Sequence, residues 1–523
     1  MGRKILLITT DQQRYDALGC NGGQIARTPV ADKLAATGVR FERGYCQNTV
    51  CMPARSTILT GQYVRTHGVI ANGIPLPVDA PSIAAVLAGA GYRTALLGKA
   101  HFEPIADPKR LWTENQLAAE GSTGPYRGFE HVEFCTHGAF GASHYATFMK
   151  DNHPDERGGF AKIFSNKPTG ETGAPEISYN PVPRELYHTD WIADRVVAWL
   201  DSLSADDDWF CWMSFPDPHH PWDPPGSERY RVNWRDLDLP AGHPGSDAKI
   251  REILGNKPAH WLAWYEGRIG NVDAAPGNFV PASMTHDQFR EVLALIHIEN
   301  ELIDEACGRV LKRIGERGWD ADTDVFYTAD HGEFQGDYGL LYKGPYHTDS
   351  LMRLPYVWRP APSAGITPAV VTEPVGQLDL APTFCAIAGV PVPDWMDGSP
   401  LPTSAGSDRV RAITEWDSQL DTGYHFRTIV RDGWMCTAYE PSTPDEGLPM
   451  ALIYSQYGMT DPVEKIVYDG TEGELYHLGD DPHQFINRWN DPACAKLRGE
   501  LVADLYDNLP PARQPALAVQ ALA

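Results

Sequence analysis

The chain has 523 residues, of which 42% are hydrophobic and 22% charged, a composition typical of a soluble globular protein with one large domain and a smaller one. Its formal net charge of -25, from 44 basic and 69 acidic residues, excludes a protein that binds nucleic acid through clustered Lys and Arg. Any anionic substrate therefore has to bind in a locally positive pocket.

The N-terminus and the cysteines predict a cytoplasmic protein that does not enter a membrane. Only the four strongly apolar residues Ile5–Ile8 follow the basic start, too few for the core of a signal peptide. No uninterrupted apolar stretch reaches the roughly 18 residues of a membrane span. The nine cysteines, an odd number without a Cys-x-x-Cys pair, fit a reducing compartment better than a disulfide framework.

Four short apolar runs predict strands, and a cluster of reactive side chains follows each of them. The runs are Ile5–Thr10, Thr94–Gly98, Trp209–Phe215 and Val325–Ala329. Such runs are typical of parallel strands that helices bury on both faces, and ligands bind beyond the carboxyl ends of those strands. We therefore expect the side chains that follow the runs to share one site. They are Asp11, Gln12, Lys99, His101, His219, His220, Asp330 and His331.

Helices are predicted between these strands, at Pro29–Thr37, at Ser82–Gly89 and from about Asp287 to Arg313. In the last of them, apolar residues recur near a period of 3.6. The alternation predicts an α/β fold with a large mixed, mostly parallel sheet sandwiched by helices.

Two segments, 104–185 and 221–282, are rich in Gly, Pro, Trp and Tyr and interrupt this alternation. Connections of that length are uncommon inside a compact domain and are usually functional. We expect both to be insertions near the mouth of the site, where they shape the substrate pocket.

A Ser-, Gly- and Asp-rich linker after Asp397–Pro402 predicts a domain boundary. We assign residues 1–403 to a catalytic domain and residues 404–523 to a smaller α+β domain with a tail. The smaller domain should contain strands near 427–430 and 434–439 and a helix near 492–508. Its Ala- and Pro-rich end, 510–523, is expected to be frayed or to pack on a neighbouring subunit.

The pentad Cys51-Met52-Pro53-Ala54-Arg55 carries the most specific signal, because Ser56–Tyr63 extends its pattern as Ser-Thr-x-Leu-Thr-Gly-x-Tyr. A cysteine near a helix start is usually only a core residue. By chance, a Cys-x-Pro-x-Arg pentad occurs in roughly a few per cent of chains of this length. With this continuation, the probability that the match is due to chance falls to about one in a hundred.

The pentad and four further landmarks resemble the type I sulfatases and their relatives, the phosphonate monoester hydrolases, within the alkaline phosphatase superfamily. The landmarks are Thr28–Phe41, Gly91–Ala95, Asp379–Thr383 and Glu474–Leu478. The resemblance covers nearly the whole chain and implies an alkaline phosphatase-like fold and a homo-oligomer. It also implies that a formylglycine-generating enzyme converts Cys51 to formylglycine, an aldehyde, during maturation.

Asp11, Asp330 and His331 follow two strands that a parallel sheet can place side by side, and such groups suit a divalent cation. The resemblance implies that these residues, with Gln12 and the modified Cys51, are the metal ligands. Common sulfatases have a second Asp where this chain has Gln12, whereas phosphonate monoester hydrolases share the Gln and the His. Both Ca²⁺ and Mn²⁺ therefore stay open.

The resemblance also implies the remaining roles. A hydroxyl of hydrated formylglycine attacks sulfur or phosphorus, and Arg55, one helical turn further, holds the reacting oxygens. Lys99 contacts the sulfate, and His101 is the base that removes a proton from the second hydroxyl, expels sulfate and restores the aldehyde. His219 and Lys343 protonate or stabilise the leaving alcohol.

Lys99 and His101 favour sulfate esters, because phosphonate monoester hydrolases tend to have Tyr and Thr at these positions. We therefore predict an arylsulfatase-like sulfuric ester hydrolase that acts on small anionic esters. Phosphonate monoester or phosphodiester hydrolysis by the same machinery is the alternative, and a binding protein without catalysis is a remote one. His220 and His347 are weaker candidates for contacts with the substrate.

Overall fold

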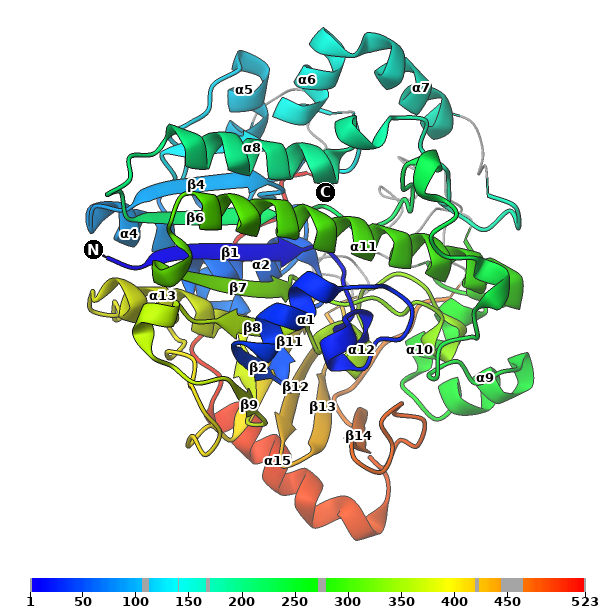
Figure 1. The fold of residues 1–523 in the computed structure, drawn as a ribbon. Coiled ribbons are helices and arrows are strands. Elements are labelled where there is room, and N and C mark those ends of the chain that lie inside the picture. Colours follow the sequence, from blue (N-terminus) through cyan, green and yellow to red (C-terminus); the bar gives the residue numbers. More distant parts are fainter. Residues whose placement is uncertain are drawn as a thin grey trace.

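The computed structural model describes residues 2–105, 112–139, 141–165, 170–270, 279–418, 423–443 and 464–521. A mixed eight-stranded sheet with the strand order β5-β4-β6-β1-β7-β8-β2-β9 crosses its centre (Figure 1). The strands are β5 (His131–Phe134), β4 (Arg93–Gly98), β6 (Trp209–Ser214), β1 (Lys4–Thr10), β7 (Thr323–Ala329), β8 (Tyr356–Arg359), β2 (Val39–Phe41) and β9 (Ala369–Val371). The first five are parallel, and β8 is antiparallel to both of its neighbours.

Helices cover both faces of this sheet, because alternate side chains of its central strands are apolar on both sides. In β1, Ile5 and Leu7 belong to one core, and Leu6 and Ile8 belong to the core on the opposite face. The first core includes α2 (Cys51–Thr60), α4 (Ile83–Gly89) and α13 (Leu380–Ala388); the second includes α1 (Pro29–Ala36), α8 (His188–Ser202) and α11 (His286–Glu316) (Figure 1). The predicted α/β fold with a mostly parallel sheet is confirmed.

The longest helix, α11, begins with a capping box in which Thr285 and Gln288 satisfy each other's backbone N–H groups. It extends the predicted helix Asp287–Arg313 at both ends. No helix in the described parts of the chain has both the length and the apolar composition needed to cross a membrane.

The register of the parallel strands brings their carboxyl ends to one level. Thr9 and Gly98 both pair with Ser214, and Thr10 pairs with Ala329. The residues that follow β1, β4, β6 and β7 therefore leave the sheet together at one edge.

The predicted insertions contain regular structure of their own. The first holds α5 (Thr113–Glu120), β5, α6 (His144–Asn152) and α7 (Pro154–Ser165), and the second holds α9 (Asp247–Leu254) and α10 (Ala259–Tyr265). Because β5 pairs with β4, the first insertion also extends the large sheet. Strand β5 is only four residues long and half-exposed on alternate positions, which explains why its sequence gave no strong strand signal.

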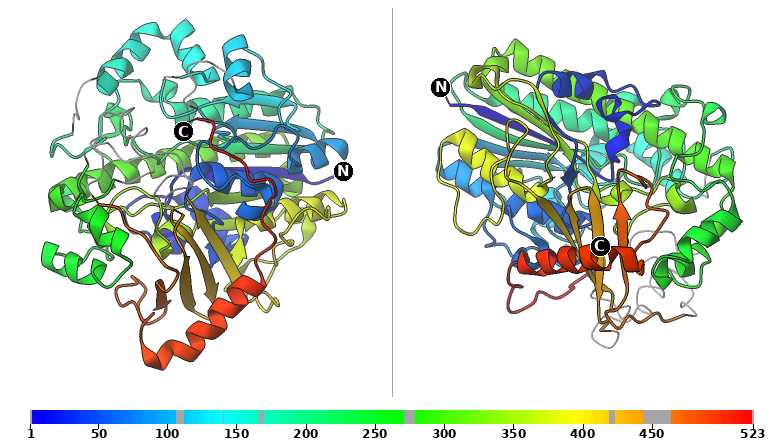
Figure 2. Two further views of the ribbon diagram at one scale, coloured as in Figure 1. Left: turned by 180° about the vertical axis from the view of Figure 1, so that it is seen from behind. Right: turned by 90° about the horizontal axis from the view of Figure 1, so that it is seen from below.

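A second, antiparallel sheet forms the C-terminal part of the chain. It consists of β11 (Arg411–Asp417), β12 (His425–Arg431), β13 (Trp434–Glu440) and β14 (Gly473–His477), in that order. Helix α15 (Ala495–Asp507) packs on its outer face through Leu501 and Leu505 (Figure 2). The smaller α+β unit is thus confirmed, while its limit at residues 403 and 404 stays a prediction. Smaller elements are β3 (Gly44–Tyr45), β10 (Val375–Gly376), α3 (Val64–His67) and α12 (Asp349–Met352).

After α15, the described part of the tail packs against the large domain of the same chain and is not frayed (Figure 2). The Arg513 N–H donates to the Arg65 carbonyl at 2.6 Å, and the Gln520 N–H donates to the Gly73 carbonyl at 2.9 Å. Leu517 and Val519 pack against the core that contains α2.

The small sheet is bonded directly to the segment that precedes α2. The Glu415 N–H donates to the Gln47 carbonyl at 2.9 Å, and the Asn48 side chain donates to the Glu415 carbonyl at 2.8 Å. The buried Glu415 carboxylate accepts from Arg65 at 2.7 Å and lies 3.6 Å from Arg427. One carboxylate therefore joins β11, β12 and α3.

We expect Glu415→Gln to lower the free energy of unfolding by about 2 to 3 kcal/mol, because Arg65 and Arg427 lose a buried counter-charge while Asp417 still pairs with Arg427. Denaturant unfolding followed by tryptophan fluorescence measures the change. Asp432→Asn is the control, because the Asp432 side chain is 70% exposed in its ion pair, and its midpoint should equal that of the wild type. Equal midpoints for both variants would show that the buried network adds no stability.

Candidate active site

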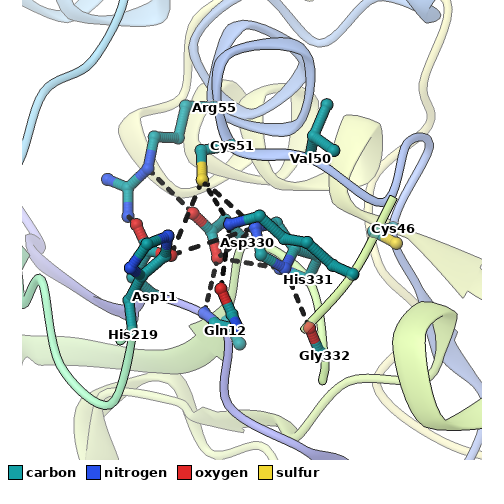
Figure 3. Close-up of polar contacts among 12 residues, drawn as sticks. Asp11, Gln12, Cys46, Val50, Cys51, Arg55, His219, Asp330, His331 and Gly332 are labelled. Carbon is teal, nitrogen blue, oxygen red and sulfur yellow. Dashed lines mark hydrogen bonds and ion pairs between the residues drawn. The ribbon is translucent and has the colours of Figure 1, made fainter. Parts of the chain in front are cut away.

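Four potential ligand groups converge beyond the strand ends. They belong to Asp11 after β1, Cys51 at the start of α2, and Asp330 and His331 after β7 (Figure 3). One ligand atom from each lies within 4.8 Å of all the others, and all four residues are buried. Sequence positions that are far apart thus meet at the predicted edge of the sheet.

Backbone groups fix the two groups that follow β7. The N–H groups of Gln12 and His331 donate to Asp330 Oδ1 at 3.0 and 2.9 Å. His331 Nδ1 lies 2.9 Å from the Gly332 carbonyl, which can only accept, so Nδ1 carries the proton. The lone pair on His331 Nε2 therefore faces Cys51 Sγ at 3.2 Å.

Cys51 is the first residue of α2, where backbone N–H groups and the helix dipole favour negative charge. The Asn72 side chain accepts from the next N–H group, that of Met52, at 3.0 Å. Burial, and then the Asp11 carboxylate, raise the pKa of the Cys51 thiol to about 12. An unmodified Cys51 is therefore protonated at neutral pH in the protein without a cation and is not an activated thiol nucleophile.

Arg55 connects the strand ends. Its Nε donates to Asp330 Oδ2 at 2.9 Å, and its Nη2 donates to Asp11 Oδ2 at 3.1 Å. Its Nη1 donates to the Lys99 carbonyl and to Ser214 Oγ, both at 2.8 Å. These contacts orient both carboxylates, and the predicted role of Arg55 in holding the ester stays a prediction.

Two lysines add positive charge beside Cys51. Lys99 Nζ lies 2.5 Å from Asp11 Oδ2 and 3.9 Å from Cys51 Sγ. Lys343 Nζ lies 3.2 Å from Cys51 Sγ and 2.9 Å from Gln12 Oε1. Burial alone would raise the pKa of Asp11, but its cationic neighbours, Lys99 foremost, lower it well below its usual value. The two lysines supply the local positive charge that an anionic ester needs in an acidic protein.

His101 lies on the segment after β4 and has a positive φ of 58°. Both of its ring nitrogens are buried without a hydrogen-bond partner. Burial, followed by the charges of Lys99 and Arg55, lowers the pKa of His101 well below its usual value. Its imidazole is therefore neutral and has a lone pair available to accept a proton.

His219 lies between two other histidines, with ring centroids 4.1 Å from those of both His137 and His220. Its Nδ1 donates to the His220 carbonyl at 2.5 Å, which leaves Nε2 with a lone pair. Burial and the nearby Lys343 lower the pKa of His219 well below its usual value. Sequence reasoning missed His137, whose Nε2 lies 3.0 Å from Lys99 Nζ. Its position just after β5 was the available signal, but that strand was not predicted.

The two weaker candidates lie in different surroundings. His220 Nδ1 is 2.8 Å from a carboxylate oxygen of Glu176, in the first insertion. His347 instead faces the small sheet, where its Nδ1 lies 2.6 Å from Thr428 Oγ1 and its ring packs edge-on against Phe426.

The convergent donors fit a divalent cation. His331 Nε2 lies 3.9 Å from Asp11 Oδ1 and 3.7 Å from Asp330 Oδ1, so these three atoms surround a common point without bonding one another. The Gln12 Oε1 accepts from Lys343 Nζ, and its Nε2 is buried without a hydrogen-bond partner. Two carboxylates, one imidazole and one amide suit Ca²⁺ or Mn²⁺.

Comparisons with known proteins show the family and the fold. The sequence model of the family described as Sulfatase matches residues 3–390. The uncharacterised sulfatase YidJ of Escherichia coli is 24% identical over 516 residues, 98% of this chain and 88% of its own. An arylsulfatase of Clostridium perfringens is 26% identical over 415 residues, 77% of this chain and 78% of its own. The solved phosphonate monoester hydrolase of Agrobacterium radiobacter superposes with a TM-score of 0.75 at 22% identity, covering 97% of this chain and 95% of its own.

We expect the purified protein to retain one divalent cation per chain, and Asp330→Asn to weaken its binding by at least about tenfold, because a buried anionic ligand is lost. Inductively coupled plasma mass spectrometry and titration of the metal-free protein measure both. Asp320→Asn, at an exposed carboxylate paired with Arg359, is the control and should bind as the wild type does. Full retention of the cation by Asp330→Asn would contradict the assignment.

Proposed function

Because the chain belongs to the sulfatase family, we propose that it cleaves a sulfate monoester with formylglycine, formed from Cys51, as the nucleophile. Hydrolysis of sulfate esters is the activity of that family, and this chain is a hydrolase of that kind. The observation that carries the proposal for Cys51 is its position. It lies at a helix N-terminus, between two lysines and against the Asp11, Asp330 and His331 donors.

Asp11, Asp330 and His331, together with Gln12 and residue 51, would hold the divalent cation. When bound, it would neutralise charge on the transferred group and make a hydroxyl of residue 51 more acidic. The choice between Ca²⁺ and Mn²⁺ stays open in this proposal.

The chain's own residues account for binding and for the first step. Lys99 and Lys343 flank residue 51 and attract the ester anion, while Arg55 keeps the carboxylates of Asp11 and Asp330 in place. A hydroxyl of residue 51 gives its proton to solvent as its oxygen attacks sulfur, and the bond from sulfur to the alcohol oxygen breaks.

The alcohol leaves with the electron pair and takes up a proton. His219 is neutral and presents a lone pair at Nε2, so it has no proton to give from that atom. We therefore assign the proton to Lys343, whose Nζ lies 3.2 Å from Cys51 Sγ, and assign orientation of the alcohol to His219.

The second step regenerates residue 51. The neutral His101 accepts the proton of the remaining hydroxyl, the carbon–oxygen bond to sulfate breaks, and sulfate departs with that electron pair. The carbonyl of residue 51 re-forms and is hydrated by water.

Phosphonate monoester hydrolysis is the second candidate. It is supported by Gln12 and His331 beside Cys51 and by the similarity in fold to the Agrobacterium enzyme. Lys99 and His101 support the sulfate ester as the preferred substrate.

A reducing compartment, as in the cytoplasm, is the proposed environment. None of the nine cysteines, all of which lie in the described residues, forms a disulfide, and seven of them are buried. The predicted homo-oligomer and the predicted modification of Cys51 by a formylglycine-generating enzyme stay predictions.

We expect the tryptic peptide Gly44–Arg55 from protein made in its native host to contain an aldehyde at position 51. Fragment-ion mass spectrometry after alkylation measures this. Cys46 is an internal control in the same peptide, because it should be alkylated as an ordinary thiol. A peptide alkylated at both cysteines would refute the proposed nucleophile.

We also expect kcat/KM to be higher for an aryl sulfate than for a phenyl phosphonate monoester. Replacing Lys99 by Tyr and His101 by Thr should lower the sulfate-to-phosphonate ratio by on the order of tenfold, because an ammonium that contacts the ester is lost. Steady-state assays of both substrates with both proteins measure the ratio. A wild-type preference for the phosphonate would reverse the order of the two candidates.

A further inference from the structure

A single carboxylate holds the backbone on which His101 lies. The N–H groups of His101, Phe102 and Glu103 all donate to the side chain of Glu114, at 3.3, 2.9 and 3.2 Å. The His101 N–H bonds to Oε2, and the other two bond to Oε1. Glu114 is in the first turn of α5, in the insertion at 104–185, and is only 5% exposed.

The attachment is reciprocal and well supported. The Glu114 N–H donates back to Glu103 Oε2 at 2.9 Å, and the Tyr126 hydroxyl donates to Glu114 Oε1 at 2.8 Å. Arg127 donates to both the Tyr126 hydroxyl and Glu103 Oε1. Burial and the charge of Glu103 raise the pKa of Glu114 to about 7, although Tyr126 and Arg127 oppose this. Burying such a carboxyl group costs free energy at a position that an apolar side chain could fill.

His101 needs such support, for two reasons. Its φ of 58° lies in a region that a residue with a side chain rarely adopts, and its ring nitrogens have no hydrogen-bond partner to orient them. The direction of the imidazole therefore depends on the backbone from which it extends.

We propose that Glu114 is a positioning residue for His101, which it keeps aimed at residue 51 by binding three consecutive backbone N–H groups. The inference rests on the proposed function, in which His101 acts in the second step. It assigns to the first insertion a part in catalysis and not only in shaping the pocket. Since His101 takes no proton in the first step, loss of Glu114 should slow sulfate release and spare alcohol release.

Glu114→Gln tests this with little change in shape. The amide oxygen can still accept from Phe102 and Glu103, but the amide N–H₂ then faces the His101 N–H, donor to donor. Glu120→Gln is the matched control, the same substitution on the same helix at an exposed position. Tyr126→Phe is a milder second variant that removes one donor to Glu114 Oε1 and keeps the ring.

Two measurements are needed. Rapid-quench assays with an aryl sulfate give the rates of alcohol release and sulfate release in one turnover. Hydrogen–deuterium exchange of the amides at residues 101–103, measured by mass spectrometry, reports the backbone bonds without reference to activity. His101→Ala is measured beside the other variants as a reference for the loss of the second step.

We expect Glu114→Gln to reduce the rate of sulfate release by on the order of tenfold to a hundredfold, with alcohol release near that of the wild type. The protein with sulfate attached to residue 51, which mass spectrometry detects, should accumulate as it does in His101→Ala. The backbone amide of His101 should exchange its hydrogen faster than in the wild type. Tyr126→Phe should change both measurements in the same direction by less, and Glu120→Gln should change neither.

Wild-type exchange and a wild-type ratio of the two rates in Glu114→Gln would overturn the inference. An equal loss of both rates would also overturn it, because a general loss of structure slows both steps. A wild-type enzyme that releases no sulfate would count against the proposed function, and the exchange comparison would then still decide whether Glu114 holds this backbone.

Discussion

The site depends on the ion pairs that the planar guanidinium of Arg55 makes with Asp11 and Asp330. Asp11 and Asp330 follow neighbouring parallel strands, and two buried carboxylates this close together need a cation that contacts both. Arg55 is that cation, because two N–H groups of its planar guanidinium donate, one to each carboxylate. With Lys99 and Lys343, the described residues around Cys51 include three cations against two carboxylates. At the centre of this acidic protein, the three cations therefore suit an anionic substrate, and the two carboxylates suit a metal ion.

Both parts of the chain build this centre. The large sheet supplies the strand ends, while β11 of the small sheet is hydrogen-bonded to Gln47 and Asn48, just before α2. Val50 also packs into an apolar cluster with Trp416 and Phe426 of the small sheet. The small sheet therefore fixes the entry to α2, and a shift between the two parts would move the first residue of that helix. His347, on the segment between β7 and α12, also contacts the small sheet, through Thr428.

Sequence patterns predicted the parts of the site that directly follow a predicted strand. Buried apolar runs indicated parallel strands, and the sheet register then brought Asp11, Lys99 and Asp330 to one edge. They did not reveal His137 or Glu114, because the positions of both depend on α5 and β5 inside a segment rich in turn-forming residues. Tertiary contacts place such groups, and no spacing along the chain encodes those contacts. The positive φ of His101 has the same origin, since it is tolerated only where the surroundings hold it.

Every residue of α2 is buried, with the large sheet, α4 and α13 packed around it. The five residues Cys51–Arg55 that start this helix are thus accessible only while the chain is still unfolded. Under the proposal that an enzyme converts Cys51 to formylglycine, that enzyme would have to reach Cys51 before α2 packs into this core. Under that proposal, the yield of modified protein would depend on how fast β1 pairs with β6 and β7, which are synthesised much later.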